Sequence, residues 1–214
     1  VDFAGRIVHP QTWPADLDYT GKRVVVIGSG ATAATLIPAM ASDCAHITML
    51  QRSPTYFRIG RNAIDIADEL RRLQVDASWI HGIVRRKILH EQAVFTQRCI
   101  TEPNTVKQEL LAALRSHLGP DYDLERHFTP RYRPWQQRLA FVPDGDMFKS
   151  IAEGTVSVVT DEIERFTEEG VLLKSGTLLE ADIIVTATGF NLSVLGDIEF
   201  AIDGKALGFS DTVT

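Results

Sequence analysis

The apolar positions along the chain change their spacing as the sequence proceeds. Residues 24–27 are four consecutive β-branched residues, and such an uninterrupted run predicts a strand that is buried on both faces. The alanine-rich stretch 31–41 predicts a helix directly afterwards, and residues 46–50 predict a second, parallel strand. From residue 61 to about residue 118, apolar residues recur three or four positions apart, which predicts about three amphipathic helices.

The second half of the chain returns to short apolar runs. Residues 156–159, 163–166 and 171–173 are separated by turn residues and predict a β-meander. Residues 180–190 predict a buried strand that runs into a glycine turn, and Asp203-Gly204 predicts a hairpin. The whole pattern predicts an α/β fold: a Rossmann-like dinucleotide-binding domain with a central parallel sheet, a β-meander and a helical insertion.

The turn between the first strand and its helix has the spacing Gly28-x-Gly30-x-x-Ala33. Gly28 permits a tight turn, Gly30 has no side chain to keep a pyrophosphate away, and the small Ala33 lets the helix pack on the strand. The first helical turn also offers free backbone N–H groups to a phosphate. The spacing therefore predicts a dinucleotide site, although similar glycine turns occur where nothing binds. The residues assigned to it are Gly28, Ser29, Gly30, Ala31, Thr32 and Ala33.

The residue after the second strand indicates which dinucleotide binds. NAD sites place Asp or Glu there, roughly 20 residues beyond the glycines, to bind the ribose 2′-hydroxyl. This chain has Arg52, followed by Ser53. A guanidinium is permanently charged and can bind a 2′-phosphate through two hydrogen bonds, so Arg52 favours NADP(H) over NAD. The alternative is that Arg52 is an exposed charge at a strand end.

A second glycine turn, Thr188-Gly189, follows the strand predicted within residues 180–190. Gly189 would let the backbone approach a cofactor closely. Ala187-Thr188-Gly189 resembles the Ala-Thr-Gly motif of pyridine-nucleotide flavoproteins, and this resemblance implies that Thr188 and Gly189 belong to the cofactor site. The alternative is an ordinary strand-ending turn.

The composition narrows the range of functions. The net charge of −6 argues against a general nucleic-acid binder, and no nucleic-acid-binding motif is present. Cys44 and Cys99 show neither a metal-binding spacing nor a Cys-x-x-Cys pair, which argues against a metal site and a thiol–disulfide active site. No apolar run reaches the length of about 18 residues expected of a transmembrane helix, and no signal-peptide pattern appears. We therefore expect a cytoplasmic protein without a clear membrane signal.

A further pattern, Phe3-x-Gly5-x-x-x-His9-x-x-x-Trp13, stands in the loop-like leader before the glycine turn. It resembles the fingerprint of the Baeyer–Villiger monooxygenases, which are class B flavoprotein monooxygenases that depend on FAD and NADPH. All four fixed positions match. The resemblance implies that this segment links two nucleotide-binding domains and that His9 supports cofactor-dependent domain movement. The alternative is a linker whose aromatic side chains pack on the core and whose His9 is a satisfied hydrogen-bonding residue.

A second block is similar to the ketone-oxidising branch of that family, which includes thioamide prodrug-activating enzymes. It consists of Pro-Trp-x-Gln-Arg at residues 134–138 and Pro-Asp-Gly-Asp at residues 143–146. The resemblance implies that Arg138 is catalytic: its cation would lie against the flavin, hold the nicotinamide and stabilise a negatively charged flavin peroxide. Many family members carry Lys directly before this Arg as a second partner for the NADP phosphate. This chain has Gln137 instead, which leaves Arg52 as the main determinant.

The resemblance also implies a division of the chain. We expect residues 1–20 to be an interdomain linker, residues 21–60 and 135–190 to form the NADP-binding domain, and residues 61–134 to be the helical insertion. Residues 191–214 would begin the return to an FAD domain. Such monooxygenases carry a separate glycine-rich loop for FAD, whereas this sequence contains one dinucleotide loop. We therefore expect the NADPH-binding part of a larger enzyme.

For the complete enzyme the resemblance implies hydride transfer from NADPH to FAD, addition of O2 to give a C4a-peroxyflavin, and attack on a ketone to give an ester or lactone. S-oxidation is a related activity. The implied partners are a ketone or sulfur-containing small molecule, O2 and the FAD domain of the same polypeptide. One alternative is a stand-alone NADP(H)-binding module without oxygenase activity. Another, a disulfide reductase, is disfavoured because no Cys-x-x-Cys pair is present.

Overall fold

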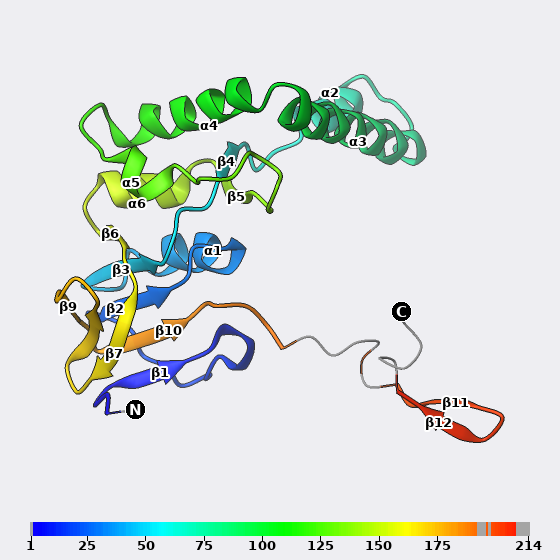
Figure 1. Ribbon diagram of the computed structural model, residues 1–214. Helices are drawn as coiled ribbons and strands as arrows, with labels where there is room; N and C mark the ends of the chain where they lie inside the picture. Colours follow the sequence, from blue (N-terminus) through cyan, green and yellow to red (C-terminus); the bar gives the residue numbers. More distant parts are fainter. Residues whose placement is uncertain (1, 192–195, 197, 209–214) are drawn as a thin grey trace.

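The computed structural model describes residues 2–191, 196 and 198–208. Its centre is a five-stranded parallel sheet with the strand order β1-β10-β2-β3-β6 (Figure 1). These strands span Arg6–Val8 (β1), Ile183–Thr186 (β10), Arg23–Ile27 (β2), His46–Gln51 (β3) and Val156–Thr160 (β6). The predicted α/β fold with a central parallel sheet is confirmed.

The strands in the middle of the sheet are buried on both faces. Successive side chains of a strand point to opposite faces, so Val24 and Val26 of β2 enter one core while Val25 enters the other. The first core contains helices α1 (Ala31–Met40) and α6 (Asp146–Ala152), and the second contains residues of the β-meander. This double burial is the physical reason for the uninterrupted β-branched run in β2.

Helices fill the region in which the apolar spacing predicts them. They are α2 (Asp65–Arg72), α3 (Ala77–Thr101), α4 (Pro103–Leu118) and the short α5 (Leu124–Phe128). In Figure 1, α4 runs above the layer of α5 and α6, and α2 lies beside α3 at the far end of this region.

The helical region shares its packing with the sheet. Leu114, Leu124 and Phe128 belong to the same buried core as α1 and α6. Strand β4 (Phe57–Gly60), which precedes the helices, pairs in parallel with β5 (Ala140–Pro143), which follows them. The helices are therefore fixed to the nucleotide-binding fold at both ends, while the exact boundaries of the insertion stay a prediction.

The leader segment differs from its prediction. The sequence predicts a loop through residues 1–20, whereas Arg6–Val8 form the edge strand β1 and pair in parallel with β10. A strand of three residues is too short to show a periodic pattern. Its formation depends on Gly5, because a Cβ atom there would lie 2.2 Å from the carbonyl oxygen of Asp182.

The meander also differs in its membership. Residues 156–159 are predicted to belong to it, but they lie in β6, which pairs with β3 in the central sheet. The antiparallel meander consists of β7 (Ile163–Thr167), β8 (Gly170–Leu173) and β9 (Leu178–Glu180).

The predicted hairpin near the end of the chain is confirmed. Strands β11 (Phe200–Ile202) and β12 (Lys205–Leu207) pair antiparallel around Asp203-Gly204. The predicted return segment, residues 191–214, lies partly outside the described residues.

Candidate functional site

The glycine turn joins the carboxyl end of β2 to the first residue of α1. Gly28 has a φ of +120°, and its N–H donates to the carbonyl oxygen of Leu50 at 2.8 Å. A Cβ atom on Gly28 would lie 2.4 Å from the carbonyl oxygen of Ala187. Gly28 is therefore required by the packing of three neighbouring strand ends, whatever binds there.

Gly30 has a different environment. A Cβ atom built on it meets nothing within 4 Å, and its φ of −82° is one that any residue can adopt. Gly30 is the N-cap of α1 and makes no side-chain cap, and the N–H groups of the first helical turn have no intrahelical acceptors. The open space above these donors can receive an anionic group such as a pyrophosphate. Ala33 is fully buried in the core beneath the helix, in agreement with its predicted packing role.

A cavity of about 550 Å³ lies beside this turn, at the carboxyl ends of β2, β3, β6 and β10. It brings together five of the predicted cofactor-binding residues, which come from three separate segments. These are Gly28, Ser29, Arg52, Ser53 and Thr188. Parallel α/β sheets bind their ligands at this edge, outside the carboxyl ends of the strands.

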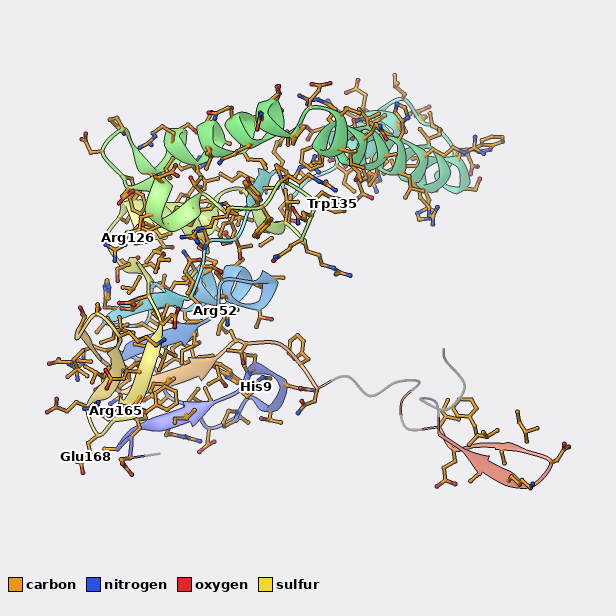
Figure 2. The ribbon with its side chains drawn as sticks, in the orientation of Figure 1. His9, Arg52, Arg126, Trp135, Arg165 and Glu168 are labelled. Carbon is orange, nitrogen blue, oxygen red and sulfur yellow. The ribbon has the colours of Figure 1, made fainter. Side chains whose placement is uncertain are left out.

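A second cavity, of about 710 Å³, begins where the first one ends. The two share Arg52, Ser53 and Glu162 in their linings. The second cavity adds Arg126 and Arg131, which the sequence did not point to. Figure 2 shows Arg52 at the end of β3 and Arg126 on α5.

Two carboxylates in the turn after β6 also line the first cavity, and the sequence analysis missed them. The hydroxyl of Ser175 and the N–H of Glu162 lower the pKa of Asp161. The ammonium group of Lys174 lowers the pKa of Glu162, and Arg52 adds to this shift. Both carboxylates are therefore charged at neutral pH and partly balance the arginines around them.

Buried polar contacts fix the strand ends around the cavities. The hydroxyls of Ser29 and Thr55 lie 3.1 Å apart. Gln51, which is only 2% exposed, donates from Nε2 to the carbonyl oxygen of His127 at 2.7 Å and to the hydroxyl of Thr160 at 2.9 Å. His127 Nδ1 lies 2.9 Å from the same hydroxyl. The end of β3 is thus joined to α5 and to the end of β6.

The fingerprint residues are spread along the edge of the sheet. Phe3 packs against the core on the meander side, and Gly5 allows β1 to approach β10. His9 Nε2 lies 2.8 Å from the carbonyl oxygen of Gly189. Trp13 packs against the opposite core with its ring edge-on to Tyr19. The leader is therefore attached to the second predicted glycine turn by His9.

Arg138 lies apart from these two cavities. It is exposed two residues before the start of β5 and lines neither of the two cavities described above. It forms no ion pair with any residue that the structure describes. Its neighbour Gln137 does line the second cavity. The structure thus brings together the glycine turn, Arg52 and Thr188, while Arg138 faces outward.

These residues fit a phosphorylated dinucleotide. The uncapped helix N-terminus leaves room for a pyrophosphate above Gly30, and Arg52 offers a cation at the end of the next strand. Among the described residues, no group of three or more His, Cys, Asp or Glu side chains could hold a metal ion. None of the helices that the structure describes combines the length and the apolar character needed to cross a bilayer.

No family model matches the chain. Individual sequence relatives and solved structures, in contrast, do match it. The chain is 46% identical over 213 residues to the FAD-containing monooxygenase EthA of Mycobacterium tuberculosis, and the match covers 99% of this chain and 43% of EthA. MymA of the same organism, also named as an FAD-containing monooxygenase, is 48% identical over 216 residues with the same coverage. The chain therefore spans less than half the length of the curated relatives that it matches.

Solved structures show the same fold. An oxidised steroid monooxygenase bound to NADP superposes with a TM-score of 0.67 at 22% identity, covering 96% of this chain and 46% of that chain. An open structure of cyclohexanone monooxygenase gives 0.67 at 20% identity, covering 99% of this chain and 48% of that chain. The chain is therefore a homologue of the FAD-containing monooxygenases, aligned with about 43% of their length.

Proposed function

We propose that this chain is the NADP(H)-binding part of an FAD-dependent monooxygenase. The complete protein would insert one oxygen atom of O2 into a ketone, or oxidise a sulfur-containing small molecule. The observation that carries the proposal is the single cavity that joins the glycine turn, through Gly28 and Ser29, to Arg52 and Ser53. Two further observations support the same assignment. The sequence relatives are named FAD-containing monooxygenases, and the similar steroid monooxygenase structure is bound to NADP.

The chain's own residues would hold the nucleotide in a defined orientation. The pyrophosphate would cross Gly30 and accept hydrogen bonds from the N–H groups at the start of α1. The 2′-phosphate would accept hydrogen bonds from the guanidinium of Arg52 and the hydroxyl of Ser53. Thr188, at the end of β10, would line the same cavity from the other side.

Arg138 is the proposed catalytic residue of the complete enzyme. FAD, when bound, supplies the hydride acceptor and the oxygen-activating group. An arginine stays protonated at any physiological pH, so an outward-facing Arg138 without an ion-pair partner among the described residues can stabilise negative charge that develops next to it. Its exposure before β5 is compatible with contact to a further domain.

His9 and Gly189 would connect the nucleotide site to the leader. The hydrogen bond between His9 Nε2 and the Gly189 carbonyl joins the leader to the turn that follows Thr188. A displacement of this turn by a bound nucleotide would therefore reach the leader directly. Through this hydrogen bond, His9 would transmit a movement of the turn to the leader and so support a domain movement.

Calorimetric titration of the chain with NADP⁺, NAD⁺ and FAD tests the proposal. The wild-type chain should prefer NADP⁺ to NAD⁺. In Arg52→Ala the affinity for NADP⁺ should fall by about 10- to 100-fold, because a hydrogen bond to a charged group contributes about 1.5–3 kcal/mol. The affinity for NAD⁺, which lacks the 2′-phosphate, should change by less than about twofold.

The matched control is Arg85→Ala, which removes the same charge from an exposed position on α3 outside both cavities. It should leave both affinities unchanged. A preference of the wild-type chain for NAD⁺, or stoichiometric binding of FAD that competes with NADP⁺, would contradict the assignment of this cavity.

A further inference from the structure

We propose that Arg126 binds the 2′-phosphate of NADP(H) together with Arg52 and supplies a second positive charge to that site. The inference rests on the proposed NADP(H)-binding function and extends it to a residue that no sequence motif marks. Gln137, which stands where many similar enzymes carry Lys, lines the same cavity as Arg126 but brings no charge.

A single guanidinium does not neutralise the expected ligand. A phosphate monoester carries about −1.5 to −2 charges at pH 7, and one guanidinium carries one positive charge. Arg52 shares both cavities with the carboxylate of Glu162, which is ionised because its pKa is lowered, chiefly by its ion pair with Lys174 and also by Arg52. A second cation beside Arg52 would therefore strengthen the binding of the phosphate.

Arg126 lines the cavity that a phosphate bound to Arg52 and Ser53 would face. Arg52 and Ser53 line both cavities, so a phosphate bound to them faces the 710 Å³ cavity that Arg126 lines. Arg126 also helps to lower the pKa of Asp161, after the hydrogen bonds from Ser175 and the backbone. Because Asp161 lines the first cavity, the charge of Arg126 also acts on that cavity.

Partly buried contacts of the next residue, His127, hold the backbone that carries Arg126. The carbonyl oxygen of His127, the residue after Arg126, accepts a hydrogen bond from Gln51 at 2.7 Å. The side chains of Gln51 and His127 each lie 2.9 Å from the hydroxyl of Thr160. Gln51 immediately precedes Arg52 in the sequence. The backbone segments that carry the two arginines are thus joined by one network, which limits the entropy lost when both bind one phosphate.

The guanidinium of Arg126 is available for a ligand. Arg126 is exposed and forms no ion pair within residues 2–191. Its backbone N–H, in contrast, donates to Asp123 at 3.0 Å and holds the start of α5 in place. The side chain can therefore be changed with little effect on the fold.

The test is calorimetric titration of the whole chain with NADP⁺ and with NAD⁺, using Arg126→Gln and the control Arg85→Gln on α3. Arg126→Gln should weaken NADP⁺ binding by about 10-fold and change NAD⁺ binding by less than about twofold. Arg85→Gln should change neither. Adding Gln137→Lys to Arg126→Gln returns a cation to the same cavity and should recover most of the lost NADP⁺ affinity.

The possible results separate this inference from the function on which it rests. If the wild-type chain does not prefer NADP⁺ to NAD⁺, the NADP(H) proposal fails and this inference fails with it. If Arg52→Ala abolishes that preference but Arg126→Gln leaves it intact, only this inference is overturned. Equal losses for both nucleotides in Arg126→Gln, or no recovery with Gln137→Lys, would show that the missing charge is not the cause and would also overturn it.

Discussion

Replacing Gly28 and Gly30 of the turn between β2 and α1 by alanine, one at a time, should separate a structural role from the proposed binding role. A Cβ atom on Gly28 would meet the backbone of Ala187, directly after β10, whereas a Cβ atom on Gly30 points into open space. The first substitution should therefore damage the fold. The second should leave the fold intact and block the ligand.

The cost of Gly28→Ala follows from two observations. The φ of +120° is unfavourable for alanine, which costs about 1–3 kcal/mol. The new methyl group would also lie 2.4 Å from the carbonyl oxygen of Ala187, so the end of β10 must shift, at a further cost of about 1–3 kcal/mol. The free energy of unfolding should fall by about 2–6 kcal/mol, and the Tm by roughly 4–24 °C.

Gly30→Ala should be nearly neutral for stability. Glycine is favoured over alanine at an N-cap by about 0.5–1 kcal/mol, but the alanine restricts the unfolded chain and returns about 0.4–1 kcal/mol. If the pyrophosphate crosses Gly30, the methyl group displaces it from the N–H groups of α1. Loss of one hydrogen bond to a charged group, about 1.5–3 kcal/mol, weakens NADP⁺ binding by about 10- to 100-fold.

Urea unfolding measures the first effect, and calorimetric titration with NADP⁺ measures the second. Gly154→Ala is the control for backbone strain, since Gly154 has a φ of +81° but no atom within 4 Å of its would-be Cβ. It should lose stability by about 1 kcal/mol and bind NADP⁺ normally. Unchanged NADP⁺ affinity in folded Gly30→Ala would refute the placement of the pyrophosphate, and full stability of Gly28→Ala would refute the packing argument.

Two further predictions concern the edge of the sheet. In Gly5→Ala the methyl group would lie 2.2 Å from the carbonyl oxygen of Asp182, so β1 must move away from β10 and a thermal scan should show a Tm lower by roughly 2–12 °C; an unchanged Tm would contradict it. Hydrogen bonds from Arg23 lower the pKa of Asp182 below its ordinary value of 3.8. The carboxylate therefore stabilises the fold above that value, and this stabilisation is lost as the pH falls through the lowered pKa. Urea unfolding between pH 7 and pH 3 should show Asp182→Asn to be less stable than wild type at neutral pH, with the difference shrinking in acid; a constant difference would contradict this.

The sequence by itself determined the elements whose information is local. The β-branched run of β2, the spacing of Gly28, Gly30 and Ala33, and the periodicity of α1 identify a strand–turn–helix unit without reference to any distant residue. Arg52 could also be predicted from the sequence, because the number of residues between the glycine turn and the end of the next strand varies little in such folds. The helices of residues 61–118 were predicted for the same reason, since their apolar spacing repeats over many turns.

The tertiary structure alone decided which distant segments complete the sheet and the site. Strand β1 is too short for a periodic pattern, and β6 resembles a meander strand until its pairing with β3 is seen. Asp161 and Arg126 reach the cavities from a turn after β6 and from α5, far from the glycine turn in the sequence. The positions of Asp161 and Arg126 depend on strand pairing and on contacts between distant segments. The residues next to them in the sequence encode neither the pairing nor these contacts. The sequence therefore predicted the glycine turn and Arg52 as parts of one site, and the fold showed which charged residues surround them.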